Sequence, residues 1–391
     1  MKKYIALLFL MLSVSTSYVF GYYNYDDFID FLVHSNQFRA RLDKLGFKLE
    51  ANNVHVAAGL TSITAGKIFN NLYSMTDMET SQNNGTELQK YFFIPKAVAG
   101  IGYKTSMVGV GLGYEFAYSD PSYQVHTPIL TATVLNDNIR INVPVSIGIG
   151  SKEKDGEMGI STPIELRYYM NLPFMSNIRL YAKYGEYKNN ANAKRKSFGI
   201  ATRIYFRVET EDVLIEPIIR LQYDQALKTK DENGKTWAGE NFDITAFNRA
   251  AFSTGRDYRG YVADDLGLLQ TLGYKIEDPY RFSVAVPVGF TSSSDTISLY
   301  LEPSLSFNMI GGSRIYKSNQ NNSDLIKLRK DLFYTVGYLV YGEIYLKPTK
   351  SLEWYTEIQT GGATVIGSFN KGSVSEFVLN ASTGITWYFS L

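Results

Sequence analysis

Cysteine is absent from the 391 residues of this sequence, and histidine occurs only three times, at widely separated positions. The first absence excludes disulfides, thiol catalysis, cysteine-ligated zinc and an N-terminal lipid on cysteine. The sequence also has no G-x-S-x-G or H-E-x-x-H motif, so it offers no catalytic or metal-ligating constellation. We therefore predict that the protein is not an enzyme and uses neither a metal nor a cofactor.

Long hydrophobic runs and an excess of one charge are missing as well. No run of about 20 apolar residues follows the N-terminal stretch, so we expect no transmembrane helix. The formal net charge is +1 and no basic stripe is present, so nucleic acid is not an expected partner.

The first residues have the layout of a secretory signal peptide. Two lysines precede the apolar stretch Ile5–Leu12, and small or polar residues follow. This stretch is too short to span a bilayer, so we expect export with cleavage after Gly21, or after Ser17 as the second choice. The alternative for residues 1–21 is a buried N-terminal helix.

From residue 47 to the C-terminus the apolar residues recur with a period of two, which is the period of a β-strand. Each of fourteen such stretches reaches the length of about 9–11 residues that a tilted transmembrane strand needs. They are 54–64, 92–104, 107–117, 122–135, 138–150, 157–170, 177–188, 197–208, 213–224, 280–291, 295–308, 332–346, 351–366 and 376–391. We predict an all-β fold: a transmembrane antiparallel barrel of fourteen strands over residues 47–391, with twelve or sixteen strands as alternatives.

Residues 26–45, within an N-terminal segment 22–46, are predicted to be a helix. Apolar residues recur there at three- and four-residue spacing, as on one face of a helix; they are Phe28, Phe31, Leu32, Phe38, Leu42 and Leu45. Two aspartates suit the start of this helix and Gly46 suits its end. The helix either packs in the periplasm under the barrel mouth or plugs the lumen.

The connections between the predicted strands support a barrel. Short connections such as Asn136–Asp137 alternate with longer polar ones, as expected when the C-terminus lies in the periplasm. We expect the long surface loops to be 65–91, 225–279 and 309–331. The stretch 266–276 could be a fifteenth strand, and we assign it to a loop because an odd number of strands would break the alternation.

The chain ends on a strand with an aromatic, apolar face formed by Ile385, Trp387, Phe389 and Leu391. Such an edge aggregates in a soluble protein, whereas closure of the sheet in a membrane removes the edge. We expect these residues to face outer-membrane lipid and to form the strand that the barrel-assembly machinery inserts.

The opposite face of the predicted strands carries charge, and charges on an inward face need water or partners. By strand phase this face holds Glu115, Arg140, Glu165, Arg167, Arg179, Lys183, Arg203, Arg207, Glu216, Arg220, Glu302, Glu353 and Glu357. The candidates for the lumen or its constriction are Arg140, Arg203, Arg207, Arg220, Glu216, Glu302, Glu353 and Glu357. An arginine side that faces a glutamate side would orient polar solutes in a water-filled pore. The alternative is an Arg–Glu network that fills a closed barrel.

The leader, the sequence Tyr22-Tyr-Asn-Tyr25, the segment Asp26–Leu45 and the ending Thr383–Leu391 together resemble the Brachyspira variable surface protein family of intestinal spirochaetes. The resemblance spans the whole chain. It implies an abundant, surface-exposed outer-membrane protein whose variable loops are seen by host antibodies, with homo-oligomers as a further expectation. The family supplies no catalytic residues.

Three functions fit these observations. We expect a porin-like channel for small polar solutes that is also a variable surface antigen. One alternative is a non-conducting surface antigen or adhesin that displays its loops, above all the aromatic-rich loop 225–279. The other is a transporter of hydrophobic molecules that is gated by the 26–45 helix.

Overall fold

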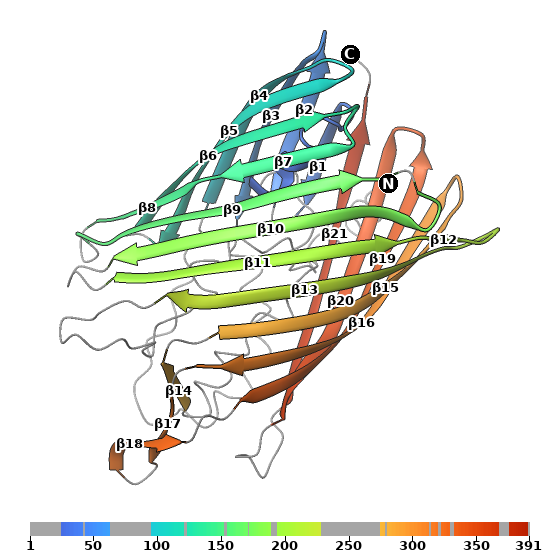
Figure 1. Ribbon diagram of the computed structural model, residues 1–391. Helices are drawn as coiled ribbons and strands as arrows, with labels where there is room; N and C mark the ends of the chain where they lie inside the picture. Colours follow the sequence, from blue (N-terminus) through green and yellow to red (C-terminus); the bar gives the residue numbers. More distant parts are fainter. Residues whose placement is uncertain are drawn as a thin grey trace, which may run out of the picture.

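The strands of this protein form a closed barrel in the computed structural model (Figure 1). The structure describes residues 25–41, 44–62, 95–120, 123–151, 155–170, 172–188, 194–227, 274–277, 280–312, 314–319, 322–328, 332–366 and 375–389. Among these residues, no helix is long and apolar enough to cross a membrane.

Sixteen antiparallel strands make the wall of the barrel. Each strand pairs with the next along the chain, and β1 also pairs with β21, which closes the sheet. Two of the sixteen are interrupted, at Val145 between β7 and β8 and at Arg207 between β11 and β12. The wall consists of β1 (Gln37–Arg41), β2 (Lys44–Ala51), β3 (Val54–Ser62), β4 (Pro95–Lys104), β5 (Val108–Asp120), β6 (Tyr123–Val134), β7 (Ile139–Pro144) with β8 (Ser146–Gly150), β9 (Met158–Tyr169), β10 (Met175–Lys188), β11 (Lys194–Phe206) with β12 (Val208–Glu209), β13 (Leu214–Leu227), β15 (Tyr280–Ser293), β16 (Ile297–Gly311), β19 (Phe333–Thr349), β20 (Leu352–Ile366) and β21 (Ser375–Tyr388).

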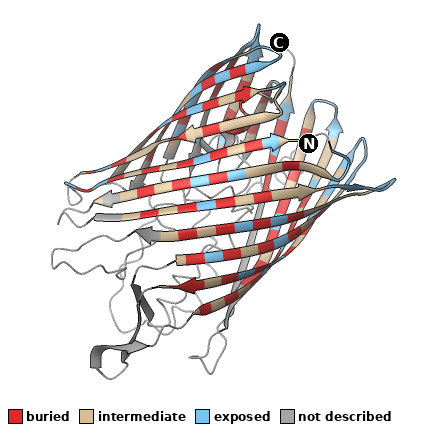
Figure 2. Ribbon diagram, viewed as in Figure 1, coloured by how far each residue is buried: buried red, intermediate tan, exposed pale blue. Residues whose placement is uncertain are grey.

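The wall has exposed apolar side chains on its outer face and buried polar side chains on its inner face, the reverse of a soluble protein. On β16, Leu301, Leu305 and Phe307 are exposed, whereas Glu302 and Asn308 are buried. Figure 2 shows this alternation of buried and exposed residues along strand after strand. An apolar outer surface with polar side chains inside is what a barrel in lipid requires.

The predicted number of fourteen strands is wrong, and the alternative of sixteen is correct. All fourteen predicted stretches contain barrel strands, and the two additional strands, β1 and β2, precede them. Both lie in or next to the stretch 26–45 that was predicted to be helical. Gly46, predicted to end that helix, is a buried residue within β2.

The predicted N-terminal helix is also wrong for most of its length. A single short 3-10 helix, η1 (Tyr25–Asp30), replaces it. Phe28, Phe31 and Leu32 keep helical spacing because they pack on one surface, whereas Phe38 lies in β1 and Leu45 in β2. The strands β1 and β2 are stabilised by pairing with β21, with each other and with β3. The spacing of apolar residues within one segment does not indicate such pairing between segments.

Short turns join the strands at one end of the barrel, among them Asn52–Asn53, 105–107, 135–138 and 294–296. At the other end, β14 (Tyr274–Glu277) pairs with β17 (Arg314–Asn319), and β17 pairs with β18 (Asn322–Leu328) in a separate three-stranded sheet. The assignment of 266–276 to a loop outside the barrel is therefore confirmed for residues 274–276, and residues 266–273 lie outside the described residues. The leader 1–21 and the loop 65–91 lie outside the described residues.

Candidate functional site on the inner wall

Five arginines form a continuous row across the inner wall. The strand pairing places Arg140 (β7) opposite Arg167 (β9), and Arg167 opposite Arg179 (β10). It then places Arg179 opposite Arg203 (β11), and Arg203 opposite Arg220 (β13). Residues directly opposite each other in neighbouring strands point to the same face, about 5 Å apart at Cβ. We call Arg140, Arg167, Arg179, Arg203 and Arg220 the arginine row.

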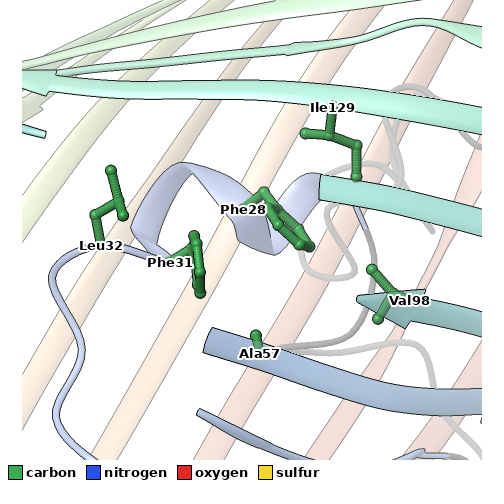
Figure 3. Close-up of a cluster of buried hydrophobic side chains, with 6 residues drawn as sticks. All are labelled: Phe28, Phe31, Leu32, Ala57, Val98 and Ile129. Carbon is green, nitrogen blue, oxygen red and sulfur yellow. The ribbon is translucent and has the colours of Figure 1, made fainter. Parts of the chain in front are cut away.

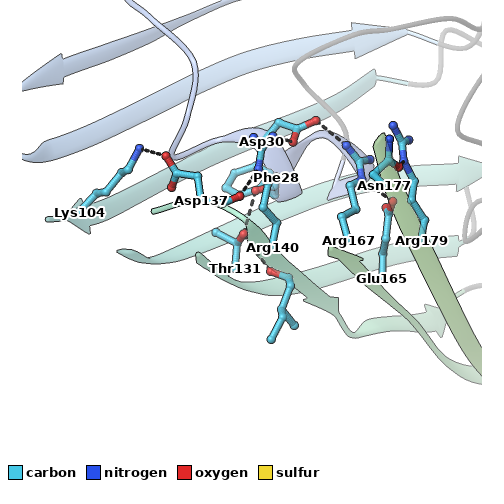
Figure 4. A network of polar contacts seen from close by, with 11 residues as sticks. Phe28, Asp30, Lys104, Thr131, Asp137, Arg140, Glu165, Arg167, Asn177 and Arg179 are labelled. Carbon is cyan, nitrogen blue, oxygen red and sulfur yellow. Dashed lines mark hydrogen bonds and ion pairs between the residues drawn. The ribbon is translucent and has the colours of Figure 1, made fainter. Parts of the chain in front are cut away.

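The first two members of the row bind one carboxylate from η1. Asp30 Oδ1 accepts a hydrogen bond from Arg140 Nη1 at 2.6 Å, and Asp30 Oδ2 accepts one from Arg167 Nη1 at 2.7 Å (Figure 4). Arg167 Nε also donates to Glu165 Oε1 at 2.6 Å. Charge-assisted hydrogen bonds of this length are among the strong ones, so Asp30 holds η1 to the wall.

Burial disfavours the charged form of Asp30, but Arg167 and Arg140 outweigh burial and hold the pKa of its carboxyl well below the usual value. Four residues further on, burial and the nearby Lys48 ammonium lower the pKa of His34 to about 3, although Asp30 acts in the opposite direction. At neutral pH the segment therefore carries a charged Asp30 and a neutral His34.

Apolar contacts fix η1 and the turn that follows it to the wall. Phe28, Phe31 and Leu32 form a buried cluster with Ala57, Val98 and Ile129 (Figure 3). Beneath them, the inner face of β4 and β5 carries glycines at positions 100, 102, 109, 111 and 113. A Cβ at Gly100 or Gly113 would overlap the Phe28 ring, and one at Gly102 would overlap Leu32. These glycines make room for η1, which lies against the lumen wall.

The other members of the row differ in their surroundings. Arg203 is 1% exposed and lies over the Tyr181 ring at 4.4 Å, a cation–π geometry. Arg220 Nη2 is 3.3 Å from Glu302 Oε1 on β16. The half-buried Arg179 lies over the Tyr205 ring at 4.6 Å and donates from Nε to Asn177 Oδ1 at 3.2 Å.

Carboxylates gather on the strands β16, β19 and β20. Glu343 and Glu357 are directly opposite each other, and like charges in such a pair repel. The Tyr341 hydroxyl lies between the two carboxylates, within hydrogen-bond distance of Glu343 Oε1 and 3.0 Å from Glu357 Oε2, and its single proton is shared between them. In a closed ring of sixteen strands, strands eight positions apart lie on opposite sides, so β7 and β9 lie across the barrel from β20 and β21. The arginine row thus begins opposite this acidic wall.

A second ionic cluster lies on the inner face of β10, β13 and β15. Lys183 Nζ is 2.6 Å from Asp224 Oδ1, and Arg281 Nη2 is 2.7 Å from Asp224 Oδ2. Asp224 is completely buried, so its charge depends on these two partners. Lys183 was placed on the inner face by strand phase. Asp224 follows the same phase four residues after Arg220, so the sequence held the signal for it as well.

The predicted lumen residues largely face inward. Arg140, Arg203, Arg220, Glu302, Glu353 and Glu357 lie on the inner wall, and Glu216 is half-buried on β13. Arg207 differs: it is exposed where β11 gives way to β12, and it pairs with Glu209 there. The pairing register with β13 is the same on both sides of the interruption. Arg207 lies four residues beyond Arg203 along this strand, near the turn, so it is not a member of the arginine row. The candidate set omitted Asp30, because a predicted helix gave no reason to place it against the wall.

The terminal strand fits its predicted place in the wall. Ile385 and Trp387 are exposed on the outer face, and β21 pairs with both β20 and β1. Phe389 is half-buried, and Leu391 lies outside the described residues. In the part of the chain that the structure describes, no group of three or more acidic or histidine side chains could hold a metal ion.

Residues 2–388 match the family described as Serpulina hyodysenteriae variable surface protein. The chain belongs to this family. The match confirms the resemblance seen in the sequence. Together with the closed barrel and its apolar outer face, it identifies an outer-membrane β-barrel protein of the variable surface protein family. No curated protein matches the chain.

Several solved outer-membrane proteins are similar to this variable surface protein in fold. A bacterial polysaccharide outer membrane secretin has 9% sequence identity and a TM-score of 0.45, over 89% of this chain and 90% of that one. The outer membrane channel DcaP of Acinetobacter baumannii has 10% identity and a TM-score of 0.37, over 75% and 84% of the two chains. OmpT, an outer membrane protein of Vibrio cholerae, has 11% identity and a TM-score of 0.33, over 76% and 89%.

Our prediction that the chain is not an enzyme does not stand. OmpT of Vibrio cholerae is among the similar structures, at 10–11% identity and a TM-score of 0.33. Such a likeness assigns neither an activity nor its lack.

Proposed function

We propose that this variable surface protein is a porin-like channel for small polar solutes. The observation that carries the proposal is the arginine row, five guanidinium groups in direct register across five neighbouring strands of the inner wall. Like charges placed opposite each other cost stability. Because the row lowers the stability of the barrel, we attribute it to selection among the solutes that pass through the lumen.

The alternative to a pore is an ionic network that only fills the barrel. The pairs Arg140–Asp30, Arg167–Glu165 and Arg220–Glu302 would serve that purpose. The number of strands favours the pore, because side chains can fill a barrel of about eight strands and a larger barrel leaves more space. The transverse field between the arginine row and the acidic wall would orient polar solutes and set ion selectivity.

Reconstitution of the folded protein in planar bilayers tests the channel. We expect discrete conductance steps with a preference for anions, and a reduced preference in Arg203→Gln. Correctly folded protein that gives no conductance steps would reject the proposal.

A second function is display of variable surface antigens, favoured by the family and by the small sheet β14–β17–β18. That sheet joins strands from the two predicted surface loops 225–279 and 309–331. Deletion of residues 314–328 should abolish recognition by antibodies raised against intact cells and leave conductance unchanged. Retained recognition would count against this function.

The hypothesis of a transporter of hydrophobic molecules loses the observation on which it was based. It depended on a 26–45 helix with a continuous apolar face, and residues 37–41 and 44–51 are strands of the wall.

Export, assembly and association complete the proposal. Cleavage after Gly21 would give a mature chain that starts at Tyr22, which N-terminal sequencing of the membrane protein checks. The exposed Ile385 and Trp387 on β21 support insertion of this strand by the barrel-assembly machinery and contact with lipid. Homo-oligomers remain a proposal from the family, and cross-linking in the native membrane tests them.

A further inference from the structure

The middle of the arginine row has positive charge that faces the lumen. Arg179 is directly opposite Arg167 on one side and Arg203 on the other. It is half-buried, whereas Arg203 is buried. Arg179 is thus a more exposed residue between two buried arginines.

In the part of the chain that the structure describes, the contacts of Arg179 leave most of its donors unused. A guanidinium has five N–H donors, and in Arg179 the Nε–H donates to Asn177 while the plane lies over the Tyr205 ring. Within the described residues, no carboxylate pairs with Arg179. Stacking and the Nε hydrogen bond fix the plane of the group, and the two Nη groups are left to bind an anion.

The neighbouring members of the row already show which chemistry the wall binds. Asp30 places its two carboxylate oxygens on Arg140 and Arg167, one on each. A carboxylate from the chain itself therefore bridges two successive arginines of the row. Figure 4 shows Arg179 beside this arrangement, with Asn177 next to it on the same strand, β10.

We propose that Arg179, flanked by Arg167 and Arg203, is a binding site for a small carboxylate or phosphate anion. Both ligand types present oxygens that match the guanidinium fork. The inference rests on the proposed channel, because the site would then lie on the path of the solute and make anions its preferred class. It goes beyond the channel in naming one residue and one ligand chemistry.

Calorimetric titration of the full-length folded protein in detergent tests the site. The probes are succinate and inorganic phosphate at low ionic strength, with glycerol as an uncharged control. We expect wild-type protein to bind at least one of the two anions, and glycerol to give no binding heat. Arg179→Gln should weaken anion binding about tenfold or more, since charge-assisted bidentate hydrogen bonds are lost.

Two further variants make the test specific. Arg207→Gln removes the same charge from an exposed arginine outside the row, and it should leave the affinity within about twofold, because exposed charges are screened by solvent. Arg179→Lys keeps the charge and loses the fork, so an intermediate affinity is expected. Heat-modifiable migration in gels confirms that each variant is folded, and Arg179→Lys carries the comparison if Arg179→Gln does not fold.

The outcomes separate this site from the channel. No anion binding to the wild type, an unchanged affinity in Arg179→Gln, or an equal loss in Arg207→Gln would overturn the site. Binding of succinate alone or of phosphate alone supports the site and decides whether its ligand is a carboxylate or a phosphate. Titration in detergent needs no conduction, so anion binding without conductance steps would reject the channel alone, and conductance without binding would reject the site alone.

Discussion

At the scale of single residues, Asp30 connects the N-terminal segment to the barrel. Its carboxylate is shared by Arg140 and Arg167, which come from different strands. Removing one partner from a buried ionic cluster costs more than the cluster contributes as a whole, because the remaining charges lose their compensation. Asp30 therefore has a strong influence on the docking of the segment.

Asp30→Asn should release η1 from the wall. The neutral amide lacks the negative charge that strengthens the two hydrogen bonds, so the docking of η1 on the wall should weaken by about 2–3 kcal/mol. Hydrogen–deuterium exchange over residues 28–36 measures the release, and exchange in β9 and β10 should stay as in the wild type. Glu209→Gln is the matched control, because it breaks the exposed pair with Arg207; equal exchange of the segment in both variants would contradict the role of Asp30.

Acid should release the same segment. The lowered pKa of His34 means that its contribution is complete above the unfolded value of about 6.5 and falls as the pH drops toward about 3. The lowered pKa of Asp30 means that its contribution is present above about 4 and is lost at more acidic pH. Lys48, Arg39 and Arg140 also act on His34 and stay charged throughout this range.

After correction for the intrinsic pH dependence of amide exchange, the protection of residues 28–36 should therefore be lower at pH 5 than at pH 7.5, and lower again below pH 4. His34→Gln should remove the first change and keep the second. If the corrected protection of the segment is equal at pH 7.5 and pH 5 in the wild type, His34 does not control its docking.

At the scale of elements, the glycines of β4 and β5 form the seat of η1. A Cβ at Gly113 would overlap three atoms of the Phe28 ring. The inner face of these two strands is therefore shaped for the helix, whereas the outer face carries exposed residues such as Ile101 and Leu112. One pair of strands thus meets lipid on one side and the N-terminal segment on the other.

Gly113→Ala should displace η1 and leave the barrel folded. Overpacking of this kind costs about 1–3 kcal/mol, and the short helix can move more easily than the strands. Limited proteolysis of residues 25–36 should become faster, while heat-modifiable migration is unchanged. Gly342→Ala is the control, because a Cβ there meets nothing nearer than Tyr300 O at 3.7 Å. Protease resistance as in the wild type for Gly113→Ala would show that η1 does not need this seat.

At the scale of the whole molecule, closure of the barrel depends on its first strand. β1 pairs with β21 through five residue pairs, from Gln37↔Tyr388 to Arg41↔Gly384. Without closure, two strand edges would face lipid with unpaired backbone groups, which a membrane does not tolerate. The two strands absent from the sequence-based prediction are thus needed for the wall.

Two deletions distinguish the role of the wall strands β1 and β2 from that of the segment that carries η1. Removal of residues 37–51, with β1 and β2, should abolish the folded, heat-modifiable form. Removal of residues 22–34 should keep that form, because every barrel strand remains, and it should raise single-channel conductance if η1 narrows the lumen. A folded barrel after the first deletion would contradict closure through β1.

The sequence located fourteen of the sixteen strands because alternation is a local signal. In 138–150, apolar residues alternate with polar or small ones, and the two sets lie on opposite faces of the sheet in the structure. A further local signal was present at Asn52–Asn53, where both residues have positive φ, at 48° and 69°. Asparagine tolerates this conformation and favours tight hairpins, so this pair marked the turn between β2 and β3. The apolar spacing of Phe28, Phe31 and Leu32 obscured it.

The sequence by itself determined which side chains meet lipid and which meet the lumen, since a period of two assigns each residue to a face without reference to any partner strand. It also determined the short turns and the apolar terminal strand. Only the tertiary structure decided the closure at sixteen strands, the place of η1 on its glycines, and the register that brings five arginines into one row. The physical reason is that pairing and closure depend on hydrogen bonds between segments far apart in the chain, which no local pattern specifies.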